Sequence, residues 1–125
     1  MTEDRKRLES FEDLVVFQKA YKLSLIIHRH SLCFPKEERF GLADQIRRAS
    51  KSICANLAEG WGKEARSPAE FKRFIQMAIG SADEVRLWIR YCFDLGYFAE
   101  DTWMTLRDDY QEVAKMLQGL HRNWK

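Results

Sequence analysis

The stretch SPAEFKRFIQMAIGSADEVRLWIRYCFDLG, residues 67–96, decides the fold because it has the pattern of one long amphipathic helix. Ser67 suits the N-cap, Pro68 the first helical position, and Glu70 the third position of a capping box. The main apolar positions alternate spacings of three and four, as in a coiled-coil seam: Phe71, Phe74, Ala78, Ser81, Val85, Trp88, Cys92 and Leu95. We therefore predict a helix over residues 68–95 that packs along its whole length.

Three further segments carry helical periodicity, at about residues 12–32, 41–59 and 101–122. Pro35 follows the first of them, and the residue before a proline is disfavoured in a helix. Gly60-Trp61-Gly62 is expected to end the second, since glycine accepts the left-handed conformation at a helix end. Four helices with short connections, and no segment with strand alternation, predict an all-α fold. The expected architecture is an antiparallel up-down-up-down four-helix bundle, with residues 1–125 as a single domain.

The first helix carries two apolar stripes on roughly opposite faces. One consists of Leu14, Phe17, Tyr21, Leu25, His28 and Leu32, and the other of Val16, Ala20, Leu23 and Ile27. A helix that covers one core needs one stripe, so the second predicts burial against another subunit. His28 therefore fits a core or interface histidine. His28 and His30 lie about 200° apart around a helix and cannot share a metal ion.

Composition excludes several classes of protein. The 125 residues are 46% hydrophobic and 32% charged, which is typical of a folded globular chain. The net charge of +2 is too balanced to indicate a nucleic-acid partner unless the charge is segregated by face. Three widely spaced cysteines and a charged N-terminus predict reduced thiols in the cytoplasm. No apolar run approaches the roughly 20 residues of a membrane span, so we expect no membrane partner.

The second predicted helix places a polar stripe, Arg48, Ser52, Asn56 and Glu59, beside its core stripe. If Glu59 faces Glu70 in an antiparallel hairpin, Arg48 comes opposite Ser81 and one turn from Glu84. A partly buried arginine needs such an anionic partner. We therefore predict a structural polar network with the following members: Arg48, Ser52, Asn56, Glu59, Ser81 and Glu84. Nothing supplies a nucleophile and base pair, so no catalytic residue, cofactor or metal is expected.

Three segments carry a resemblance to a known family: FEDLVVFQKA (11–20), CFPKEERFGLADQIRRASKSICANLAEGWGK (33–63) and AEFKRFIQMAIGSADE (69–84). They resemble the four-helix-bundle proteins encoded within intervening sequences of bacterial large-subunit ribosomal RNA genes. This resemblance implies a homopentamer of bundles. A looser similarity to accessory proteins of diversity-generating retroelements implies binding of RNA and of a reverse transcriptase.

Local charge segregation favours an RNA partner. Residues 45–58 contain three cations and no anion. We predict that five basic side chains contact phosphates: Arg47, Lys51, Lys63, Arg66 and Arg73. The alternative for this set is a solvated surface or contact between subunits.

Three functional hypotheses remain open from the sequence. The first is a non-enzymatic, cytoplasmic homopentamer that binds structured RNA. The second is a protein-binding adaptor, for example an accessory subunit of a retroelement reverse transcriptase. The third is an enzyme or small-molecule binder, which requires a polar pocket around Asn56 and Glu59.

Overall fold

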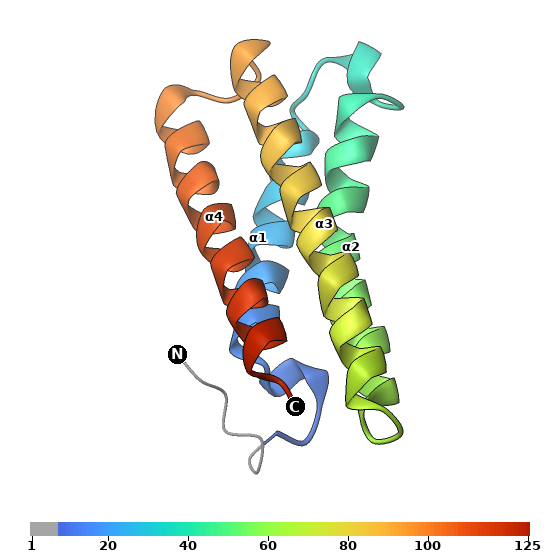
Figure 1. The fold of residues 1–125 in the computed structure, drawn as a ribbon. Coiled ribbons are helices and arrows are strands. Elements are labelled where there is room, and N and C mark those ends of the chain that lie inside the picture. The colour runs from blue at the N-terminus through green and yellow to red at the C-terminus, as the bar shows by residue number, and fades with distance from the viewer. Residues whose placement is uncertain (1–7) are drawn as a thin grey trace.

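The computed structural model describes residues 8–125, and its four helices form a bundle (Figure 1). The helices are α1 (Val15–Ser31), α2 (Leu42–Glu64), α3 (Pro68–Asp94) and α4 (Glu100–Asn123). Two short 3-10 helices, η2 (Phe11–Asp13) and η3 (Lys36–Glu38), precede α1 and α2. Both α1 and α3 pack against α2 and α4, so the helices surround one core with α1 and α3 at opposite corners. The predicted all-α four-helix bundle is confirmed.

The ends of the bundle carry different connections. The α1–α2 connection and the α3–α4 loop lie at one end, whereas the α2–α3 loop and the C-terminus lie at the other (Figure 1). Within residues 8–125, no helix combines the length and apolar content needed to cross a bilayer.

The first helix starts later than predicted. A capping box precedes it, because the Ser10 hydroxyl accepts from the Glu12 N–H at 3.1 Å and the Asp13 carboxylate accepts from the Ser10 N–H at 3.1 Å. These bonds cap the short helix η2, and Leu14 then takes an extended conformation before α1 begins at Val15. The N-cap of α3 is where the sequence placed it, since the Ser67 hydroxyl accepts from the Glu70 N–H at 3.2 Å.

The second helix ends later than predicted, because α2 runs through Gly60-Trp61-Gly62 to Glu64. Gly60 is buried where α2 approaches α3, and a Cβ added there would lie 2.5 Å from the Cβ of Phe74. The glycine therefore serves close helix packing and does not end the helix. Gly96, after α3, is the glycine with positive φ in the described chain, at 83°, as a helix C-terminus requires.

Each of the four helices contributes one stripe of buried apolar residues to the core. In α1 the buried apolar residues are Val16, Ala20, Leu23 and Ile27. The other predicted stripe of α1 faces outward only in part, since Tyr21 is 48% and Leu32 65% exposed whereas Leu14 is fully buried. A second outward apolar face lies on α3 and its C-cap residue, and consists of Met77, Leu87, Tyr91 and Leu95. Two helices at opposite corners thus each expose an apolar face that the bundle itself does not cover.

Candidate nucleic-acid interface

The five predicted phosphate-contacting residues form two separate groups. Arg47 and Lys51 lie in the first half of α2, whereas Lys63, Arg66 and Arg73 surround the α2–α3 loop. At 1.5 Å of rise per residue, Arg47 and Lys63 are about 24 Å apart along α2. The structure therefore does not bring the five together as one patch.

Arg47 and Lys51 lie beside the end of α1 that carries His28 and Arg29. The Nζ atom of Lys51 lies 3.1 Å from Nδ1 of His28. The Nε–H of Arg47 donates to the hydroxyl of Ser31, which itself donates to the carbonyl of His28 at 2.6 Å. Arg29 acts electrostatically on the same histidine. We call His28, Arg29, Arg47 and Lys51 the α1–α2 basic cluster.

The cations of the α1–α2 basic cluster form no ion pair in the described part of the chain. None of the ion pairs formed by residues 8–125 involves Arg29, Arg47 or Lys51. The nearby positive charges lower the pKa of His28 below its ordinary 6.5. Lys51 has the largest effect, followed by burial, Arg47 and Arg29. Clustered cations without carboxylates make a region of positive potential that attracts anions.

The basic group at the α2–α3 end is partly neutralised. The Nε–H of Arg73 donates to Glu70 at 2.9 Å, and this bond holds the pKa of the Glu70 carboxyl below its usual value. The guanidinium of Arg73 also lies 4.9 Å from the ring centre of Phe74, and the ammonium of Lys63 lies 5.9 Å from the same ring. Arg66 is exposed. This group offers weaker attraction to an incoming phosphate than the α1–α2 basic cluster.

Part of the predicted polar network lies between α2 and α3. The hydroxyl of Ser81 donates to the hydroxyl of Ser52 at 2.9 Å. The side-chain amide of Asn56 donates to the Ser52 carbonyl at 2.9 Å and to its hydroxyl at 3.1 Å. Glu59 is exposed. Two hydroxyls and an amide thus satisfy one another across the helix pair.

The predicted pair of Arg48 with Glu84 is wrong. The side chain of Arg48 is 77% exposed, and its Nε lies 2.9 Å from a carboxylate oxygen of Asp44 on its own helix. Glu84 is exposed and accepts from the indole N–H of Trp88 at 3.3 Å. The reason is register: because α2 continues past Gly60, Ser52 comes opposite Ser81 in the position expected for Arg48.

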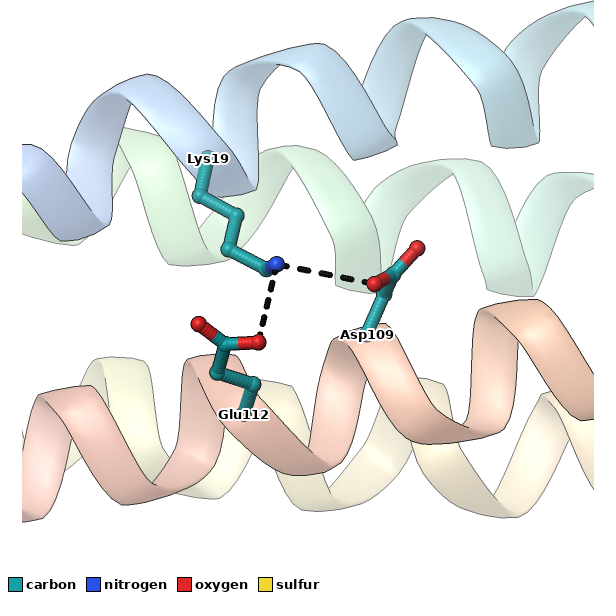
Figure 2. Close-up of polar contacts among 3 residues, drawn as sticks. All are labelled: Lys19, Asp109 and Glu112. Atoms are coloured by element: carbon teal, nitrogen blue, oxygen red, sulfur yellow. Dashed lines mark hydrogen bonds and ion pairs between the residues drawn. The ribbon is translucent and has the colours of Figure 1, made fainter.

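Lys19 is a residue whose role the sequence did not indicate. Figure 2 shows it reaching from α1 to two carboxylates of α4, with Nζ 3.5 Å from Asp109 and 3.2 Å from Glu112. Burial alone would lower its pKa, but the two carboxylates outweigh burial and hold the pKa above 10.5. This contact neutralises part of the acidic face of α4, on the side of α1 away from the α1–α2 basic cluster. Detecting it required knowing that α1 lies beside α4.

Glu38 is a second residue that the sequence reading missed. Its carboxylate accepts from the Leu42 N–H at 3.1 Å and from the Tyr97 hydroxyl at 2.7 Å. It therefore caps the start of α2 and ties it to the α3–α4 loop. The signal available in the sequence was an acidic residue just before a helix start.

Neither Asn56 nor Glu59 lines the depression found among residues 8–125. The open depression that the structure describes lies between α1 and α4, with its lining provided by Ile26, His30, Asp101, Thr102, Thr105, Leu106 and Asp109. Within residues 8–125, no group of three or more histidine, cysteine or carboxylate side chains is arranged to hold a metal ion.

Comparison with known proteins agrees with this architecture. Residues 12–119 match the model of the family described as 23S rRNA-intervening sequence protein. The fold is similar to a crystal structure from Bacteroides thetaiotaomicron, described as a protein of unknown function from the S23 ribosomal protein family. That similarity has a TM-score of 0.76 at 24% sequence identity and covers 87% of this chain and 96% of the other. No curated protein matches the sequence.

Proposed function

Because the chain belongs to the 23S rRNA-intervening sequence protein family, we propose that it is a non-enzymatic, cytoplasmic homopentamer that binds structured RNA. The observation that carries the RNA-binding part is the α1–α2 basic cluster. Its cations gather on one surface, and none of them pairs with a carboxylate of residues 8–125. We assign the primary phosphate contacts to Arg47 and Lys51, and secondary contacts to Lys63, Arg66 and Arg73.

The geometry of Arg47 suits a phosphate. Within the described chain its hydrogen bonding uses Nε, toward Ser31, which holds the guanidinium in place and leaves both terminal nitrogens to donate. An arginine presents its donors in a planar fork that matches two phosphate oxygens. Lys51 lies one turn further along α2 and is exposed, so it can reach a neighbouring phosphate as a mobile point charge.

The outward apolar faces support the oligomeric part of the proposal. Exposed contiguous apolar surface marks an interaction site, and Leu87 and Tyr91 on α3 are each 50% exposed. Since α1 and α3 lie at opposite corners of the bundle, the exposed Tyr21 and Leu25 of one copy can cover the α3 face of the next, with His28 left at the edge toward α2. Such head-to-tail contacts close into a ring when the rotation between successive copies is a whole fraction of a turn. A fivefold ring would repeat the α1–α2 basic cluster five times and raise the effective concentration of each weak phosphate contact.

The experiment measures the affinity of a fluorescently labelled, structured ribosomal RNA fragment by anisotropy at physiological salt. We expect submicromolar affinity for the wild type and a loss of about tenfold or more for the double variant Arg47→Glu/Lys51→Glu. The matched control is Lys115→Glu/Arg122→Glu, which makes the same charge change at two exposed positions of α4. Wild-type affinity in the double variant would refute this surface as the RNA site.

Sedimentation of the same samples separates RNA contact from subunit contact. We expect wild type, control and double variant to sediment alike, as pentamers of the 14.9 kDa chain. Dissociation of the double variant would mean that Arg47 and Lys51 contact a neighbouring subunit.

The outward apolar face of α3 also fits a second function, that of a protein-binding adaptor such as an accessory subunit of a reverse transcriptase. A monomer in sedimentation, with no RNA affinity and a protein partner bound to this face, would favour the adaptor over the RNA-binding pentamer.

A further inference from the structure

We infer that RNA binding at the α1–α2 basic cluster is coupled to protonation of His28, so that the cluster holds RNA phosphates more tightly as the pH falls. This inference rests on the proposed RNA-binding function. It adds a fourth cation to that site, one that is charged only when His28 is protonated. His28 becomes a phosphate-binding residue that is neutral in the free protein and charged in the complex.

The contact with Lys51 defines the free state of His28. A protonated lysine has three donors and no acceptor, so its approach to 3.1 Å from Nδ1 requires a lone pair on that nitrogen. This contact fits a neutral imidazole with its proton on Nε2, the form that leaves Nδ1 able to accept. The charged groups acting on the ring are Lys51 and Arg47 from α2 and Arg29 from its own helix, and all three oppose its protonation. No carboxylate of α3 or α4 is among the groups that act on it.

Arrival of a phosphate reverses this balance. The negative charge compensates the neighbouring cations, and the Lys51 ammonium turns from His28 Nδ1 toward the phosphate oxygens. Nδ1 is then free to take a proton, and a protonated imidazole donates from both nitrogens. The positive charge gained beside the anion raises the pKa of His28 in the complex above its value in the free protein.

The sign of the pH effect follows from the two pKa values. Above the higher, bound-state pKa His28 is neutral with or without RNA, so affinity is at its lower plateau. Between the two values binding takes up as much as one proton, and affinity rises by up to about tenfold for each unit of pH decrease. Below the free-state pKa His28 is charged in both states, and affinity reaches its upper plateau.

The other histidines provide matched controls. His30 packs against the ring of Phe98, with ring centres 5.4 Å apart, and borders the depression between α1 and α4. His121 lies in the last turn of α4, at the opposite end of the bundle from residues 28–31. Neither acts electrostatically on His28. RNA phosphodiesters keep a constant charge over the range in which histidine titrates, so the RNA itself contributes no slope there.

The test measures anisotropy of the same labelled RNA from about pH 5.5 to about pH 8 at constant ionic strength, a range centred on histidine titration. We expect wild type, His30→Asn and His121→Asn to bind more tightly at low pH. His28→Gln should keep the weaker affinity at all pH values, and His28→Lys should keep the tighter one. Calorimetry in two buffers of different ionisation enthalpy should detect proton uptake by the wild type and none by His28→Gln.

The results distinguish a failure of the pH coupling at His28 from a failure of RNA binding itself. RNA binding by His28→Gln with the pH dependence of the wild type would overturn the inference and leave the RNA-binding function standing. An absence of RNA binding by the wild type at every pH would overturn both. Circular dichroism and sedimentation at each pH confirm that variants compared are equally folded and assembled.

Discussion

Replacing Gly60 with alanine tests the closest approach of α2 to α3. The new Cβ would lie 2.5 Å from the Cβ of Phe74 and 3.1 Å from Cδ1 of Phe71. The Phe74 Cβ is attached directly to the α3 backbone and cannot rotate away, so the two helices must move apart. Overpacking a close-packed core costs about 1–3 kcal/mol, whereas alanine improves helix propensity by about 1 kcal/mol over glycine. We expect a net loss of up to about 2 kcal/mol in the free energy of unfolding.

Two matched substitutions separate packing from propensity. Gly62 lies in the same helix and has no atom within 4 Å of an added Cβ, so Gly62→Ala should stabilise the protein by about 0.5–1 kcal/mol. Gly96 also has open space around it but a φ of +83°, so Gly96→Ala should destabilise by about 1–2 kcal/mol through backbone strain alone. The same methyl group thus has three expected effects for three physical reasons.

Urea unfolding followed by circular dichroism at 222 nm measures these differences. Protein concentration must be the same for all variants, because assembly adds to apparent stability. The expected order of stability is Gly62→Ala, wild type, then Gly60→Ala. If Gly60→Ala is as stable as Gly62→Ala, α2 and α3 do not approach at Gly60 and the description of the helix pair is wrong.

Two further substitutions test buried and capping polar groups. The hydroxyl of Tyr110 is buried without a hydrogen-bond partner among residues 8–125. Tyr110→Phe should therefore leave the free energy of unfolding unchanged or raise it by about 1 kcal/mol. A loss of about 1 kcal/mol or more in urea unfolding would mean that the hydroxyl has a partner. Two hydrogen bonds, the larger effect coming from the Leu42 N–H and the smaller from the Tyr97 hydroxyl, hold the pKa of Glu38 below its ordinary 4.5. Ionised Glu38 therefore stabilises the fold above pH 4.5, and this stabilisation is lost as the pH falls through the lower pKa of the folded state. Glu38→Gln should therefore lower the Tm at pH 7, and thermal melts should converge with those of the wild type as the pH falls through the lowered pKa of Glu38. A constant gap at all pH values would contradict this role for the charge.

Periodicity was enough to predict the existence of all four helices but not the end of α2. A glycine after an apolar stripe fits a helix end and a close helix crossing equally well, and only the position of Phe74 on another helix distinguishes them. The wrong end of α2 also led to a wrong partner for Arg48. Extending α2 by about one turn changed which residue faces Ser81, so Ser52 occupies the interface and Arg48 is exposed.

The candidate site shows a similar division. Charge segregation along residues 45–58 was sufficient to single out Arg47 and Lys51, because both lie on one helix. His28 and Arg29 join them only through the packing of α1 on α2, which no local pattern reports. The separation of Lys63 from Arg47 was accessible from helical rise alone, and the length of α2 makes it plain.

The salt dependence of RNA affinity tests the central claim most directly, because it counts phosphate contacts. Each contact contributes about −0.7 to −0.9 to the slope of the logarithm of the association constant against the logarithm of salt concentration. If Arg47 and Lys51 contact RNA phosphates, Arg47→Gln/Lys51→Gln should reduce the magnitude of the slope by about 1.4–1.8 for each copy that touches the RNA. A slope equal to that of the wild type would contradict the account and place the RNA, if bound at all, on another surface.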